Sequence, residues 1–170
     1  MAETFAAIER DFLQITSEVV WCTVTTVDGA GRPRSRVLHP IFEAIDDRAV
    51  GWVLTARTEI KTRHLAANPH VVCSYWSPAQ NVAYADCTAR WVEDDATKRH
   101  VFELFRTTPP PLGYDVSGYG PDEHRSASFT PLRLDPWRIQ VFRFGGWDKP
   151  ILPRLWRAEE LAPRSPAPGA

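Results

Sequence analysis

Hydrophobic residues near the start of the chain follow the repeat of an amphipathic helix, at spacings of three and four residues. They are Phe5, Ile8, Phe12 and Ile15. From Val19 the pattern changes to β-branched and aromatic residues, which favour a strand. Residues 28–31 have the sequence DGAG, typical of a tight turn, and residues 32–39 have the extended sequence RPRSRVLH. Two short extended runs so close together predict an antiparallel hairpin.

The same strand composition recurs at four later places along the chain. These are residues 49–56, 70–76, 81–92 and 136–144. Small residues occupy every second position between Ala83 and Ala89, which leaves room on that face for a helix, another sheet or a flat ring. In the last run, Trp137, Ile139 and Val141 alternate with polar residues, so we expect these three on one side of the sheet.

Two further helices are predicted. Thr58 can cap a helix that Asn68 and Pro69 end. Residues 93–106 place acidic residues in the first turn and a buried stripe later in the helix. That stripe consists of Val101, Leu104 and Phe105. Residues 107–128 lack periodicity and are longer than most passive connections, which favours a functional or interface loop.

Six short strands joined mostly by tight turns, with three helices, predict a mainly β protein. An antiparallel barrel is favoured over a doubly wound sheet, because parallel strands would need helices between most of them. The 170 residues suit one domain. We expect this domain to cover residues 1–146, with a C-terminal arm and Pro-rich tail over residues 147–170.

Composition narrows the range of partners. The 20 Lys and Arg residues nearly balance the 21 Asp and Glu residues, which argues against a general nucleic-acid or anionic-membrane binder. No apolar run approaches the roughly 20 residues of a membrane span, and the N-terminus is too charged for a secretory signal. Three cysteines cannot all pair, so we expect a reducing cytoplasm. The histidines are scattered, and no metal site is predicted.

Arginines at every second position form the densest polar signal. Arg32, Arg34 and Arg36 project from one face of the predicted strand, where three guanidiniums repel each other unless an anion or carboxylates lie among them. Arginine is well suited to bind phosphate. The alternative is a solvated edge strand whose charges discourage aggregation.

A second signal lies where the strand ending at Thr55 meets the helix that begins near Thr58. The start of a helix offers free backbone N–H groups that suit a phosphate. Lys61 falls in the first helical turn, where a cation is unfavourable without an anion nearby. An ordinary surface lysine is the alternative.

Familiar catalytic motifs are missing from the sequence: it contains no HExxH, GxSxG or GxGxxG. Cys22, Cys73 and Cys87 lie in apolar strands, where a buried small side chain is favoured over a reactive thiolate. If the protein is an enzyme, a bound cofactor is expected to carry the chemistry.

Taken in order, these segments resemble the pyridoxamine 5′-phosphate oxidase-like proteins, a flavin- and deazaflavin-binding split-barrel family. The resemblance covers residues 5–144. It is carried by the GRPRSRVLH strand, a strand ending in Leu54 and Thr55, a helix of pattern KxxxLxxNP that starts at Lys61, and the VVCSYW strand. It implies a six-stranded antiparallel split β-barrel of the FMN-binding type.

The resemblance also implies which residues hold the cofactor. The RVLH-like strand contacts flavin phosphate and ring, the end of the next strand lines the flavin, and the helix lysine binds phosphate. A polar residue before a later strand, Gln80 or Asn81, reaches the cofactor of the partner subunit. With the neighbouring polar positions, the expected cofactor-binding residues are Arg34, Arg36, Val37, Leu38, His39, Leu54, Thr55, Thr58, Lys61, Gln80 and Asn81.

By the same resemblance we expect a homodimer with cofactor at the subunit interface, and a flavin-dependent oxidoreductase that transfers hydride between FMN and a small organic substrate. F420 is the alternative cofactor, and a non-catalytic flavin carrier or stress-related sensor is the alternative function. The vitamin-processing oxidases of this family have an arginine immediately before the helix lysine, where this chain has Ile60. Arg57 or Arg63 could take over the role of that arginine. The C-terminal segment of the chain also differs from that of these oxidases, so pyridoxamine phosphate oxidation is not expected.

Overall fold

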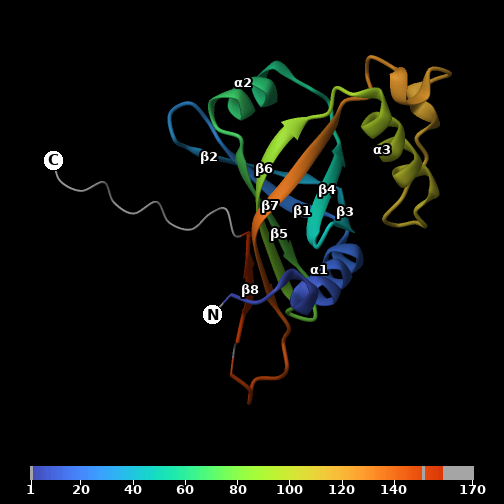
Figure 1. The fold of residues 1–170 in the computed structure, drawn as a ribbon. Coiled ribbons are helices and arrows are strands. Elements are labelled where there is room, and N and C mark those ends of the chain that lie inside the picture. The colour runs from blue at the N-terminus through green and yellow to red at the C-terminus, as the bar shows by residue number, and fades with distance from the viewer. Residues whose placement is uncertain (1, 151, 159–170) are drawn as a thin grey trace.

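A computed structural model describes residues 2–150 and 152–158 of the chain. Three α-helices and an antiparallel sheet dominate it (Figure 1). The helices are α1 (Phe5–Val19), α2 (Glu59–Ala67) and α3 (Asp95–Thr107). The strands are β1 (Cys22–Val27), β2 (Pro33–Leu38), β3 (Pro40–Ile45), β4 (Arg48–Leu54), β5 (His70–Trp76), β6 (Val82–Trp91), β7 (Pro131–Phe142) and β8 (Arg154–Arg157).

Every strand pairing in the sheet is antiparallel, and the strand order is β2-β1-β5-β6-β7-β4-β3. Strand β7 is long enough to have β6 on one side and two partners on the other. Its first residues pair with β4 and its last residues pair with β8. Because β2 and β3 end the order, the described sheet is not closed. The mainly β, antiparallel split-barrel architecture is therefore confirmed.

The expected strand count of six is wrong, because the described chain has eight strands. Strand β3 begins at Pro40, and the proline that disguised it is tolerated on an edge strand. Strand β8 buries only Trp156 and otherwise carries charged or half-buried residues, so it has little hydrophobic pattern. It lies in the expected arm, whose residues 159–170 fall outside the described part of the chain.

The main core forms where α1 packs on the sheet. All four predicted hydrophobic residues of α1 are buried. The small residues of β6 between Ala83 and Ala89 belong to the same cluster, which α1 and inward-facing residues of other strands share, so helix and sheet both pack on that face. Trp137 departs from the prediction and is only half-buried. The register of β6 against β7 shifts beside it, so Pro136 takes the inward place before Ile139 and Val141 resume.

A second core joins the other face of β4 to α3. Trp52 of β4 packs there with Val101 and Phe105. Phe102 is buried where Leu104 was expected, because the buried stripe of α3 lies slightly around the helix from the predicted one. The segment after α3 packs onto the same cluster through Phe129.

The 108–130 segment is ordered by contacts with α3. It contains two short 3-10 turns, η1 (Ser117–Tyr119) and η2 (Glu123–Arg125). Asp95 of α3 lies 3.2 Å from His124 Nε2 and accepts a hydrogen bond from Arg125 Nε at 3.3 Å. These contacts hold the segment against α3. No helix within the described residues is both long and apolar enough to cross a membrane.

Candidate functional site

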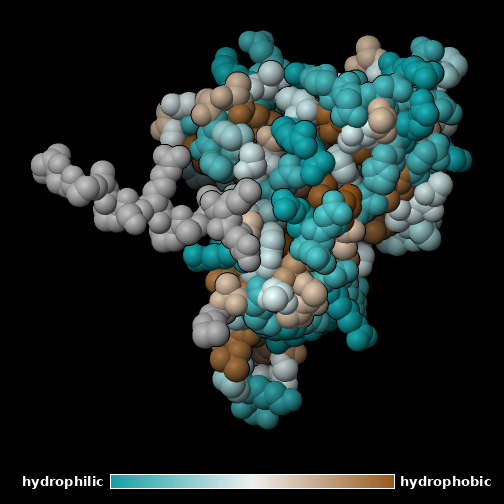
Figure 2. Space-filling model, viewed as in Figure 1, coloured by the Kyte–Doolittle hydropathy of each residue, from teal (hydrophilic) through white to brown (hydrophobic). Residues whose placement is uncertain are grey.

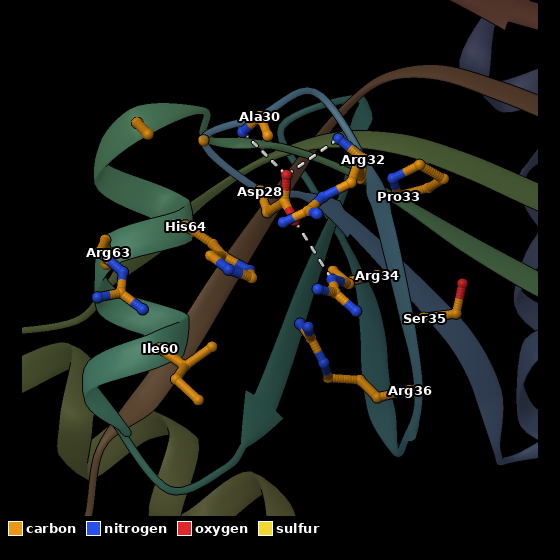
Figure 3. A pocket seen from close by; sticks show the side chains of 12 residues that line it. Asp28, Ala30, Arg32, Pro33, Arg34, Ser35, Arg36, Ile60, Arg63 and His64 are labelled. Atoms are coloured by element: carbon orange, nitrogen blue, oxygen red, sulfur yellow. Dashed lines mark hydrogen bonds and ion pairs between the residues drawn. The ribbon is translucent and has the colours of Figure 1, made fainter.

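A cleft of about 760 Å³ separates the β1–β2 turn from α2 (Figure 3). The alternation of β2 places its three arginines on one face, as the period-two spacing predicted, and the structure turns that face toward α2. We call this space the basic cleft. Its lining residues are Asp28, Gly29, Ala30, Arg32, Pro33, Arg34, Ser35, Arg36, Ile60, Arg63, His64 and Ala67.

Arg32, Arg34 and Arg36 form what we call the arginine stripe. Two of these three arginines have a carboxylate partner. Arg32 Nε and Arg34 Nε donate to Asp28 Oδ2 at 2.9 and 3.3 Å. Hydrogen bonds from the backbone N–H groups of Arg32 and Ala30 hold the pKa of Asp28 well below its ordinary value, and the Arg32 guanidinium adds to the effect. Asp28 is therefore an anion that offsets part of the repulsion among Arg32, Arg34 and Arg36.

Arg36 and Lys61 lack such a partner. Arg36 Nη2 donates to Thr26 Oγ1 at 3.2 Å, and Lys61 Nζ donates to Thr55 Oγ1 at 2.5 Å and to the Ala56 carbonyl at 3.0 Å. Neither cation has a carboxylate within 4.0 Å in the described part of the chain. Burial lowers the pKa of Lys61, and the nearby charge of Arg36 lowers it further.

The start of α2 fixes the position of Lys61. Thr58 is the N-cap, and its side chain accepts a hydrogen bond from the Lys61 backbone N–H at 3.3 Å. The lysine therefore leaves the first helical turn toward the end of β4, where Thr55 follows Leu54. Arg36 and Lys61 are two positive charges close to a helix N-terminus, and a bound oxyanion would relieve the repulsion between them.

A smaller apolar cleft of about 300 Å³ lies where β2 and β4 end. The 108–130 segment closes one side of it. Its lining residues are Trp21, Val37, Leu38, His39, Leu54, Pro111 and Tyr114. Most of this lining is hydrophobic or aromatic, which suits a flat, largely apolar ligand.

His39 brings a polar group into the apolar cleft. Its ring centroid lies 4.9 Å from that of Trp21 and 5.5 Å from that of Tyr114. Nε2 of His39 is buried and has no hydrogen-bond partner. Burial lowers the pKa of His39, so the imidazole is neutral at pH 7. Burial also raises the pKa of Tyr114, which keeps its hydroxyl protonated.

Strand β2 connects the two clefts. Arg34 and Arg36 line the basic cleft, and the next three residues line the apolar cleft together with Leu54. Thr55, Thr58 and Lys61 lie just after Leu54 along the chain. Nine of the eleven expected residues are thus brought to one region of the molecule. Their contact with a cofactor stays a prediction.

The remaining two expected residues lie in the β5–β6 turn and line neither cleft of their own chain. Gln80 Oε1 accepts a hydrogen bond from Trp76 Nε1 at 3.4 Å, and Asn81 Oδ1 accepts one from the Phe144 N–H at 3.0 Å. A contact with the cofactor of a partner subunit remains the prediction for them.

The structure distinguishes the two arginines that could replace the missing one at Ile60. Arg63 lines the basic cleft. Arg57 instead forms an ion pair with Glu93 and lies 5.2 Å from the ring centroid of Trp91. Arg63 is therefore the available substitute.

Several site residues were missed by sequence reasoning. Tyr114 and Pro111 come from the aperiodic 107–128 segment, which has no pattern to place them. His64 was one of five scattered histidines, although its position three residues after Lys61 puts both on one side of α2. Asp28 carried a usable signal, since it opens the DGAG turn next to the arginine stripe.

Comparisons with known proteins complete the description of the site. No protein-family model and no curated protein matches the chain, but solved structures do. A Clostridium acetobutylicum protein related to general stress protein 26, of the pyridoxinephosphate oxidase family, is 15% identical with a TM-score of 0.62. The match covers 90% of this chain and 94% of that one.

Two other solved structures are similar. A pyridoxamine 5′-phosphate oxidase-related, FMN-binding protein from Nostoc punctiforme is 17% identical with a TM-score of 0.62, over 89% of both chains. A heme-binding protein from Mycobacterium smegmatis is 15% identical with a TM-score of 0.58, over 90% of this chain and 58% of that one. The chain thus has the split-barrel fold of the pyridoxamine 5′-phosphate oxidase-like, FMN-binding proteins.

Proposed function

We propose that the chain binds a flavin with a phosphorylated tail, with FMN as the cofactor and F420 as the alternative. The observation that carries this proposal is the pair Arg36 and Lys61, two cations without a carboxylate partner in the described chain, next to an apolar cleft. A phosphate neutralises the pair, and the cleft accepts a planar ring.

The residues present fit both parts of such a ligand. Arg36 and Lys61 would bind the phosphate through charged N–H donors, with Thr55 and Thr58 beside them. Val37, Leu38 and Leu54 would cover the ring and exclude water from it. The unpartnered His39 Nε2 offers a hydrogen bond at the edge of the same cleft.

We further propose that the protein is an oxidoreductase acting on a small organic substrate. The bound flavin supplies hydride transfer between a donor and an acceptor. This chain's own residues position the ring and shield it, and the 108–130 segment forms the wall against which a substrate lies. FMN is preferred because it needs only one phosphate position, which the Arg36–Lys61 pair supplies beside the apolar cleft.

A homodimer belongs to the proposal. Large hydrophobic residues are exposed just before β1 and on β2, β5 and β6. These are Trp21, Val37, Trp76 and Tyr84. Two of them adjoin or line the apolar cleft, so a second copy on this face would cover the ligand. The β7–β8 connection projects from the body and also carries hydrophobic surface (Figures 1 and 2).

A non-catalytic carrier or stress-related sensor is the second candidate. Its support is that His39 and Tyr114 are the two titratable side chains lining the apolar cleft, and both are uncharged at pH 7. Two similar solved structures are described as general stress protein 26 or related to it.

A cytoplasmic location is proposed because the three free cysteines are buried strand residues, and thiols persist in reducing compartments.

Titration of the purified protein with FMN and with F420, followed by flavin fluorescence, tests the proposal. Saturable binding of one cofactor is expected. Absence of binding by both would overturn it. Reduction of the bound flavin by NAD(P)H and reoxidation by an organic acceptor supports the oxidoreductase, whereas bound flavin that never turns over supports the carrier.

A further inference from the structure

The turn between β1 and β2 contains a buried carboxylate with a full set of partners. Asp28 is 8% exposed, and its Oδ1 accepts hydrogen bonds from the backbone N–H groups of Ala30 at 2.9 Å and Arg32 at 3.0 Å. The Asp28 N–H donates to the Arg32 carbonyl at 2.9 Å, which closes the turn. One carboxylate oxygen therefore serves the backbone of the turn.

The other carboxylate oxygen faces arginine side chains (Figure 3). Oδ2 accepts from Nε of Arg32 and Nε of Arg34. An arginine held through Nε keeps its Nη donors for another partner. The two side chains are 68% and 55% exposed, so both guanidiniums remain open to a ligand. Asp28 thus fixes their orientation and leaves free the N–H groups that bind oxyanions.

Helix α2 faces this end of the basic cleft with further polar groups. Arg63 and His64 line it. His64 is only 8% exposed, yet its buried Nδ1 has no hydrogen-bond partner. A buried nitrogen without a partner points to a ligand or ordered water that supplies one. Arg32 lies four residues before Arg36, roughly 13 Å along an extended strand, so this end is separate from the Arg36–Lys61 pair.

We propose that Asp28 is a positioning residue that holds Arg32 and Arg34 as a second oxyanion subsite. The subsite takes a further phosphate or carboxylate group of a ligand whose first phosphate lies at Arg36 and Lys61. In this respect the inference rests on the proposed function. It adds that ligands with an extended anionic tail bind more tightly than ligands that end at one phosphate.

Isothermal titration with inorganic tripolyphosphate at low salt tests the subsite. Asp28→Asn keeps an oxygen for the two backbone N–H groups and loses the acceptor for the arginine Nε groups. The substitution makes the cleft more positive, so charge alone predicts tighter binding. Positioning of the arginines predicts the opposite: the affinity of Asp28→Asn for tripolyphosphate should be weaker than that of the wild type by at least about fivefold.

Asp46→Asn is the matched control, because Asp46 is exposed in the β3–β4 turn and its loss changes the net charge equally. Its affinity for tripolyphosphate should stay within about twofold of wild type. Absence of tripolyphosphate binding by the wild type would overturn the proposal, as would unchanged or tighter binding by Asp28→Asn. If Asp28→Asn does not fold, Arg34→Lys keeps the charge and removes the forked donors. It should weaken binding about threefold or more, and unchanged affinity would overturn the proposal.

The same titrations separate this inference from the proposed function. If neither FMN nor F420 binds while Asp28→Asn still weakens tripolyphosphate binding, the flavin proposal fails and the oxyanion subsite stands. If FMN binds while Asp28→Asn leaves tripolyphosphate affinity unchanged, the subsite fails and the flavin proposal stands.

Discussion

Replacing Lys61 by glutamine tests the phosphate end of the proposed site. The lysine lies in the first turn of α2, and its ammonium donates to Thr55 Oγ1 and the Ala56 carbonyl without any carboxylate partner in the described chain. Glutamine removes the charge and keeps an amide donor for those oxygens. The substitution therefore changes mainly the electrostatics of the site.

The expected loss follows from the kind of contact. A hydrogen bond between charged groups contributes about 1.5–3 kcal/mol. Because Lys61 is only partly buried, solvent screening reduces this to about 1–2 kcal/mol. FMN affinity should fall by about 5–30-fold, since each 1.4 kcal/mol is tenfold. The melting temperature without ligand should not fall, because the substitution also removes repulsion between Lys61 and Arg36.

The assay is a fluorescence titration with FMN, together with melting curves with and without saturating FMN. The stabilisation by FMN should shrink in proportion to the lost affinity. Lys98→Gln, which removes a charge from α3, is the control and should bind FMN like the wild type. Unchanged FMN affinity in Lys61→Gln would refute the assignment of Lys61 to the phosphate.

Other consequences concern pH and stability. The pKa of Lys61 lies below its ordinary value of 10.5, and a bound phosphate should raise it again. FMN binding just below pH 10.5 should therefore take up protons, which calorimetry in buffers of different ionisation enthalpy measures. Absence of proton uptake would argue against contact between Lys61 and the phosphate. The pKa of Asp28 is lowered, so its stabilisation is present above 3.8 and is lost as pH falls; acid unfolding of Asp28→Asn should be shallower, and an identical acid profile would contradict this. Gly51→Ala places a Cβ 2.6 Å from the Phe42 ring and should lower the free energy of unfolding in urea by about 1–3 kcal/mol. An unchanged free energy of unfolding would show that the ring moves aside without cost. Thr58→Ala removes the cap of α2 and should cost about 1 kcal/mol, which Thr58→Ser should largely restore.

The parts of the site that follow a local repeat could be predicted from the sequence. The period-two spacing of the arginines placed them on one face of β2, and the cap at Thr58 placed Lys61 in the first turn of α2. Both signals depend on residues close together in the chain. Their neighbourhood in space then follows from the order of strand, turn and helix.

The rest depends on contacts between distant segments. Tyr114 is held beside the apolar cleft by α3, because its backbone N–H donates to the Phe105 carbonyl at 3.1 Å and its ring packs on Phe105, and no periodic pattern in the segment encodes that contact. A register shift in one strand pair turned Trp137 away from its expected place. Strand β8 is stabilised by pairing with β7 and by the packing of Trp156 on Phe5. The composition of residues 154–157 alone predicts neither contact.

The central claim is that a flavin binds through its phosphate as well as its ring. The most direct measurement compares FMN with riboflavin, which has the same ring and no phosphate, in one fluorescence titration of the wild-type protein. We predict saturable FMN binding and a riboflavin affinity at least about tenfold weaker. Equal affinities of FMN and riboflavin, or no binding of either FMN or F420, would contradict the account.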